Sequence, residues 1–269
     1  MQTRTLTRNL AAVIMAFMAT VSVHAAPTTL IYINSSGGAL YSYDASAAYA
    51  ETLVNPSTGA FSMSSGPLAN TLYIQSGSGS LSTYNLLSNV QSTVGGSVPG
   101  NALGEGRDGL LYAGSGTSLY SVNPLTGSST LVGGGTFGYA GDIAVDPTNL
   151  TAMYGAVSTS SGVALALIDK STGTQSLVGS FGVQGDIYGL GFSLDGTLYA
   201  AGPGGGSAGS IYTINKATGA ATQVRSLTYQ PYDMATQPFE RNEVPEPTTI
   251  ALMGMALAGL GISMRRRKL

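Results

Sequence analysis

The chain has 269 residues and a formal net charge of −2, and it contains 38 glycines, a single histidine, His24, and no cysteine or tryptophan. Once the N-terminal segment holding His24 is removed, no side chains remain for a Ser-His-Asp triad, a Cys-His dyad, thiol redox chemistry or a usual zinc site. Residues 27–243 keep 5 basic and 12 acidic residues, a net charge of −7 that argues against nucleic-acid binding, which needs clustered Lys and Arg.

Residues 1–25 are predicted to form a Sec signal peptide. Arg4 and Arg8 provide the positive region, and an apolar run over residues 10–23 follows them. That run is too short for a membrane span, and small residues precede a favoured cleavage site after Ala25, with Ala26 as the alternative. The Sec translocon and signal peptidase are therefore expected partners.

Residues 26–240 are predicted to form an all-β repeat domain. A tyrosine next to an aliphatic residue recurs with spacings of 41, 39, 42 and 45 residues, at Tyr32, Tyr73, Tyr112, Tyr154 and Tyr199. Each tyrosine lies in a predicted strand, and further short strands surround it, for example residues 142–146, 165–169 and 175–178. Four strands in about 42 residues indicate a β-propeller blade, so about five four-stranded blades are expected.

Turn signals support this interpretation. A segment of the form Asn/Asp-x-x-Thr-Gly separates predicted strands at residues 123–127, 169–173 and 215–219, where the glycine suits a left-handed turn residue. Residues 232–235 resemble a first strand and are expected to complete the first blade, which closes the ring and removes its exposed edges. The same turn signature at residues 55–59 is out of phase, so six blades or an open solenoid remain alternatives.

Candidate ligand residues are carboxylates near the expected central channel. Gly141-Asp142-Ile143 and Gly185-Asp186-Ile187 are interpreted as equivalent positions of successive repeats, and together with Glu105 they are expected near one end of the channel. Asp142, Asp186 and Glu105 could perform glycosidase chemistry, bind calcium, or simply cap turns, and the turn role is favoured because it recurs in successive repeats. No catalytic residue, metal site or cofactor is assigned. Tyr139 and Tyr229 are candidates for stacking on sugar rings.

The C-terminal end has three consecutive parts. Residues 241–249 form a linker in which Pro245 and Pro247 favour an extended backbone, residues 250–264 are an uncharged apolar run, and residues 265–269 are a basic tail. The apolar run is a short transmembrane helix by length, and flanking arginines can extend it to the interface. The basic residues fix that end in the cytoplasm; they are Arg265, Arg266, Arg267 and Lys268. From these residues alone an ordinary tail anchor is equally compatible.

The order Val244-Pro245-Glu246-Pro247, apolar helix and terminal Arg cluster resembles the PEP-CTERM sorting signal of Gram-negative bacteria. The resemblance covers about a tenth of the chain. It implies recognition of Pro245, Glu246 and Pro247 by an exosortase, removal of the tail, and delivery to the cell surface or an exopolysaccharide matrix. It implies no activity for residues 27–243.

Three functions are compatible with this sequence. The favoured one is a non-catalytic surface or matrix protein whose propeller contacts polysaccharide or another surface protein. The alternatives are a carbohydrate-active enzyme and a calcium-binding adhesin, both of which would use Glu105, Asp142 and Asp186.

Overall fold

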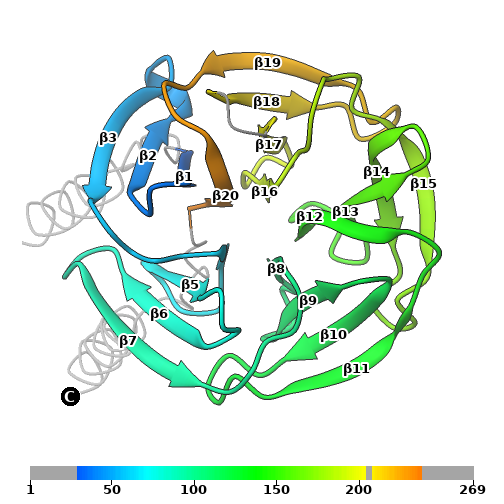
Figure 1. Cartoon of the computed structure of the whole chain (residues 1–269), viewed down its shortest axis with the longest axis horizontal. Helices are drawn as coiled ribbons and strands as arrows, with labels where there is room; N and C mark the ends of the chain where they lie inside the picture. The colour runs from blue at the N-terminus through cyan, green and yellow to red at the C-terminus, as the bar shows by residue number, and fades with distance from the viewer. Residues whose placement is uncertain (1–28, 204–207, 238–269) are drawn as a thin grey trace, which may run out of the picture.

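The computed structural model describes residues 29–203 and 208–237 as a five-bladed β-propeller (Figure 1). Each blade is a four-stranded antiparallel sheet, and the blades surround a central channel. The predicted fold class and the expected number of blades are confirmed. Among the described residues no helix is long and apolar enough to cross a membrane. The predicted signal peptide and the predicted helix at 250–264 lie outside the described residues.

Each blade extends from an innermost strand at the channel to an outermost strand at the rim of the ring. From inside to outside, blade one consists of β20 (Pro231–Thr236), β1 (Leu30–Ser35), β2 (Leu40–Asp44) and β3 (Ala50–Asn55). Blade two consists of β4 (Ser62–Ser65), β5 (Thr71–Gln75), β6 (Leu81–Asn85) and β7 (Val90–Gly95). Blade three consists of β8 (Ala102–Glu105), β9 (Leu111–Ser115), β10 (Ser118–Val122) and β11 (Ser129–Gly134).

The last two blades follow the same order. Blade four consists of β12 (Gly138–Val145), β13 (Met153–Thr159), β14 (Gly162–Ile168) and β15 (Gln175–Ser180). Blade five consists of β16 (Gly189–Phe192), β17 (Leu198–Gly202), β18 (Ser210–Ile214) and β19 (Ala221–Ser226). A single 3-10 turn, η1 (Ala45–Ala47), is the one helical element within the described ranges.

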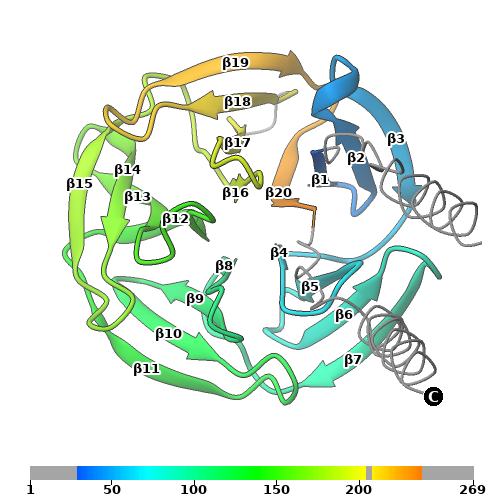
Figure 2. The ribbon, with the colours of Figure 1, turned by 180° about the vertical axis from the view of Figure 1, so that it is seen from behind.

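The ring is closed by its last strand. β20 pairs antiparallel with β1, with Ile33 opposite Met234 and Ile31 opposite Thr236. Figure 2 shows β20 from behind, between β16 and the first strands of the chain. The first blade is therefore built from both ends of the domain, as the pattern at residues 232–235 predicts, and the inner edge of β1 is covered.

The out-of-phase turn signature at residues 55–59 has a simple explanation. Asn55 is the last residue of the outer strand β3, and residues 56–59 lead from it toward β4, so this segment connects blade one to blade two. The turn between the third and fourth strands of blade one is instead made by η1, with Ala48 and Tyr49 at positive φ. Interpreting residues 55–59 as that turn is therefore wrong. The alternatives of six blades or an open solenoid are also wrong, because the structure has five blades and β20 closes the ring.

The apolar core is divided among the gaps between blades. Five clusters of buried side chains lie there, and each joins two neighbouring blades. The repeating tyrosines belong to the second strand of each blade, and four of the five are buried. Inner-strand glycines allow the blades to approach: a Cβ on Gly104 would lie 2.1 Å from the carbonyl oxygen of Ile143 in the next blade.

Both ends of the described domain lie on the same face of the propeller. The inner strands begin at one face, which we call the mouth face, and β20 ends at the other. Because β1 is antiparallel to β20, Leu30 also lies at this opposite face, where the Gln237 backbone N–H donates to the Leu30 carbonyl oxygen at 2.7 Å. Both ends of the described domain therefore leave it on the side away from the mouth.

Candidate functional site: the central channel

The inner strands can be aligned by their pairing with the tyrosine-bearing strands. Ile74, Ala113, Gly155, Ala200 and Ile33 each follow the repeat tyrosine, and their partners on the inner strands are therefore equivalent. These partners are Met63, Leu103, Ile143, Leu190 and Met234. The alignment divides the channel wall into levels that each receive one residue from every blade.

The level directly before these partners contains two carboxyl groups. Its members are Ser62, Ala102, Asp142, Gly189 and Asp233, of which Asp142 is 0% exposed and Asp233 is 2% exposed. Asp142 comes from blade four and Asp233 from blade one, and their side chains are hydrogen-bonded to each other. A buried pair of this kind forms when the two carboxyl groups share a proton.

This carboxyl pair collects backbone N–H groups from the inner strands. Asp142 accepts from Leu103 at 3.0 Å and from Leu190 at 3.5 Å. Asp233 accepts from Met63 and from Met234. Every blade thus contributes either a carboxyl group or an N–H donor, and inner-edge donors that would otherwise be unpaired are satisfied on the propeller axis.

The protonation of the pair follows from its burial. Burial raises the pKa of Asp142 well above its usual range, and the negative charge of Asp233 and the hydrogen bond to it raise it further. Burial also raises the pKa of Asp233, to about 7, although hydrogen bonds from Asp142 and from backbone donors favour its charged form. At neutral pH the pair therefore keeps at least one proton.

A cavity of about 210 Å³ lies at the mouth, one level before the carboxyl pair. Its walls come from one residue of each blade: Phe61, Asn101, Gly141, Tyr188 and Tyr232. Phe61 and Tyr232 are 41% and 42% exposed and meet edge to face with 6.3 Å between ring centroids. The hydroxyl of Tyr188 donates to the exposed carboxylate of Asp186 at 3.4 Å. The mouth is therefore an aromatic cavity with one carboxylate beside it.

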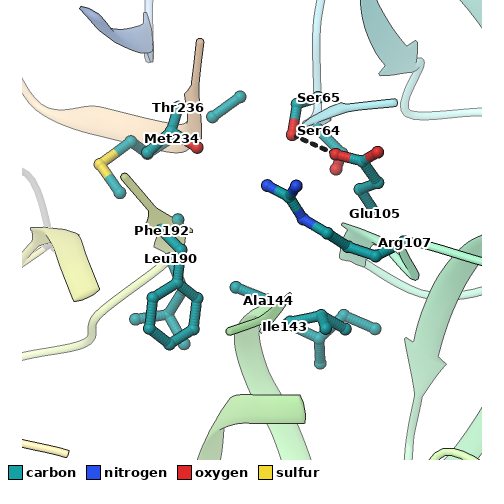
Figure 3. A pocket seen from close by; sticks show the side chains of 13 residues that line it. Ser64, Ser65, Glu105, Arg107, Ile143, Ala144, Leu190, Phe192, Met234 and Thr236 are labelled. Atoms are coloured by element: carbon teal, nitrogen blue, oxygen red, sulfur yellow. Dashed lines mark hydrogen bonds between the residues drawn. The ribbon is translucent and has the colours of Figure 1, made fainter. Parts of the chain in front are cut away.

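The other end of the channel has a different chemistry. Arg107 reaches inward there beside Glu105 and near Ser64 and Ser65 (Figure 3), and the hydroxyl of Ser65 donates to Glu105 at 3.2 Å. Burial lowers the pKa of the Arg107 guanidinium, while the charges of Glu105 and Asp146 act in the opposite direction. The enclosed volume is only about 20 Å³, which is enough for about one water molecule.

The structure separates the three carboxylates that the sequence groups together. Asp142 is buried at the axis, Glu105 lies three levels deeper than the position of Asp142, and Asp186 is exposed in the segment before β16. The residue equivalent to Asp142 in blade five is Gly189, so the equivalence of Asp142 and Asp186 is wrong. The three do not share a site.

Two further corrections concern residues that the sequence analysis named or missed. Tyr139 is buried, and Tyr229 stacks on Tyr41 at 4.5 Å between centroids, so neither is an open platform. Asp233, the partner of Asp142, is missed, although the matching strings Asp142-Ile143-Ala144 and Asp233-Met234-Ala235 signal that these two are equivalent.

Comparison with solved structures supports the fold. The chain is similar to a structure of the nidogen/laminin complex at 10% identity and a TM-score of 0.50, covering 78% of this chain and 98% of that one. It is similar to Kuenenia stuttgartiensis hydrazine synthase at 21% identity (TM-score 0.44, 63% of this chain, 49% of that chain). It is also similar to TolB from Acinetobacter baumannii at 14% identity (TM-score 0.47, 74% and 53%). The chain spans about half the length of the latter two. The similarity to the nidogen/laminin structure, at 10% identity, concerns the fold alone.

No curated protein sequence matches the chain. A family model described as the PEP-CTERM protein-sorting motif matches residues 243–268, which contain the Pro245-Glu246-Pro247 signature, the apolar run and the basic cluster. This confirms the resemblance drawn from those residues. The chain thus carries a β-propeller followed by a PEP-CTERM sorting motif, which implies an exported protein whose membrane-anchored precursor is processed by an exosortase.

Proposed function

We propose that the propeller is a non-catalytic binding module, exported to the cell surface or the exopolysaccharide matrix, where its mouth contacts polysaccharide. The observation that carries this proposal is the aromatic cavity, to which every blade contributes one residue. Large aromatic side chains left exposed around a concave site are typical of recognition surfaces. Phe61 and Tyr232 present ring faces and edges of the kind that pack against the apolar faces of sugar rings.

The placement of the carboxylates favours binding over catalysis. A glycosidase holds two carboxyl groups about 5–9.5 Å apart on either side of an accessible bond. Asp142 and Asp233, by contrast, touch each other under the floor of the cavity and are shielded from solvent. Asp186, at the surface, has Tyr188 as its hydrogen-bond partner.

The binding proposal is tested by co-sedimentation with exopolysaccharide isolated from the native host. We expect the wild-type protein to sediment with it and a Phe61→Ala/Tyr232→Ala double variant to remain in solution. Asp169→Asn is a matched control because Asn123 and Asn215 occupy the equivalent turn position in neighbouring blades. Sedimentation of the double variant with the polysaccharide would contradict a role for the mouth. If the wild-type protein binds another surface protein and does not sediment with the polysaccharide, a protein partner is favoured.

The sorting part of the proposal is tested by whole-mass spectrometry of the protein recovered from the envelope and the medium. We expect a chain that begins after Ala25 or Ala26 and ends near residues 244–247. A Glu246→Ala variant is expected to keep residues 250–269 and to stay in the membrane fraction. A wild-type mass that includes those residues would mean a tail-anchored membrane protein.

A further inference from the structure

The electrostatic surroundings of the mouth indicate which sugars it favours. The five residues that line the cavity include no Lys or Arg. The Tyr188 hydroxyl of the lining donates to the Asp186 carboxylate at 3.4 Å. Under the floor lies the buried pair formed by Asp142 and Asp233. Because the buried pair keeps its protons, the negative charge beside this aromatic cavity comes from Asp186.

The polar groups gather at one side of the cavity. The pKa of the Tyr188 hydroxyl is raised by burial, and also by the nearby Asp186 carboxylate and the Tyr232 hydroxyl. The Asp186 carboxylate is thus hydrogen-bonded to the Tyr188 hydroxyl, and the ring of Phe61 packs against the ring of Tyr232, which also lines the cavity. A cation at this position would face a carboxylate and the negative faces of aromatic rings at once, the arrangement used to recognise ammonium groups.

The size of the cavity limits the bound group to about one ring. Pockets for drug-sized ligands begin at roughly 300 Å³, whereas this cavity measures about 210 Å³. A single sugar residue that carries an amine has both an apolar ring face for stacking and a protonated nitrogen near neutral pH.

We propose that the mouth binds a protonated amino sugar of a polysaccharide. The sugar ring packs against Phe61 and Tyr232, and the ammonium group faces Asp186 and the Tyr188 hydroxyl. This inference rests on the proposed binding function and specifies its ligand: a glycan with free amines is preferred to the same glycan with acetylated amines or with hydroxyl groups instead.

The test is isothermal titration calorimetry at pH 6 with the processed protein recovered from its host. The probes are β-1,4-linked tetramers of glucosamine, N-acetylglucosamine and glucose, with tetramethylammonium and a lysine tetrapeptide as ammonium sources without a sugar. We expect the glucosamine tetramer to bind at least ten times more tightly than the other two glycans, and its affinity to fall as salt is added.

Variants separate the charge from the stacking. Asp186→Asn keeps the shape and is expected to weaken glucosamine binding about tenfold while leaving the N-acetylglucosamine affinity unchanged. Tyr232→Ala is expected to abolish binding of all glycans, and Asp169→Asn, at a turn on the opposite face, is expected to change nothing. Circular dichroism confirms that each variant is folded.

The outcomes of these experiments separate the preference for an amino sugar from the proposed binding of polysaccharide. If all three glycans bind equally and Asp186→Asn has no effect, the ammonium preference is wrong and glycan binding stands. If the lysine peptide binds and no glycan does, the assignment to a sugar is overturned. If none of the probes binds, this inference falls, while co-sedimentation with the native polysaccharide still decides the proposed function separately.

Discussion

Replacing Asp142 with asparagine tests the protonated carboxyl pair directly. Both members of the pair have a pKa above that of an unfolded aspartate, so the folded state holds protons that the unfolded state releases. A raised carboxyl pKa contributes stability that is greatest at low pH and is lost as pH rises through the folded pKa. The protein is therefore expected to become less stable between pH 5 and pH 7 because of this pair.

The size of the effect follows from linkage. Each retained proton lowers the free energy of unfolding by about 1.4 kcal/mol per pH unit, or about 2.7 kcal/mol from pH 5 to pH 7. Asparagine cannot ionise, and its amide can donate to Asp233 while its oxygen still accepts from Leu103. Asp142→Asn should therefore reduce the pH dependence of the free energy of unfolding by the contribution of one proton. From pH 5 to pH 7 the variant should lose about 2.7 kcal/mol less stability than the wild type.

The assay is urea unfolding at pH 5, 6 and 7, followed by circular dichroism or tyrosine fluorescence because the chain has no tryptophan. The only histidine of the chain is His24, which precedes the predicted cleavage site, and hydrogen bonds lower the pKa values of Asp169 and Asp195, away from this range. Asp169→Asn is the control and should keep the wild-type slope. Equal slopes for Asp142→Asn and the wild type would refute the shared proton.

Three further predictions concern packing, charge and metal. Gly104→Ala should cost roughly 3 kcal/mol in a thermal or urea melt because its Cβ meets a backbone carbonyl of the next blade, whereas Gly77→Ala, with open space around it, should be neutral. Lys216→Met leaves the buried Asp146 carboxylate without its cation and should cost about 2 kcal/mol, against about 1 for Lys170→Met at a more exposed pair; equal losses would contradict this. Millimolar calcium should leave the melting temperature unchanged, because no group of three metal-ligating side chains lies within residues 29–203 and 208–237; a rise of several degrees would favour the adhesin.

The blade count and the closure could be predicted because they depend on local signals. Each repeat tyrosine lies in a second strand, and each glycine of the Asn/Asp-x-x-Thr-Gly turns has positive φ, for example 73° at Gly173. These features depend on periodicity and turn chemistry, which short stretches of sequence specify. The same signature at residues 55–59 is misleading, because these residue types also suit a connection between two blades. They therefore do not identify a turn within a blade.

The site was less predictable because it depends on register across the whole ring. The connection from β12 to β13 covers residues 146–152, two residues more than the connection from β16 to β17 at residues 193–197. Because of this difference, Asp142 and Asp186 precede their repeat tyrosines by nearly the same number of residues in the sequence. In the structure they nevertheless lie at different levels of the channel. The contact between Asp142 and Asp233 joins blades four and one, and no local pattern reports it.

The position of the domain's two ends has a consequence for how the protein is presented. Gln237 lies on the face opposite the mouth, and 12 residues, 238–249, separate it from the apolar run at Ile250, a reach of at most about 40 Å when fully extended. A propeller joined to its anchor through that face has its aromatic cavity on the side away from the point of attachment. Attachment through the tail therefore leaves the mouth clear of the chain's own exit point, both in the anchored precursor and after processing.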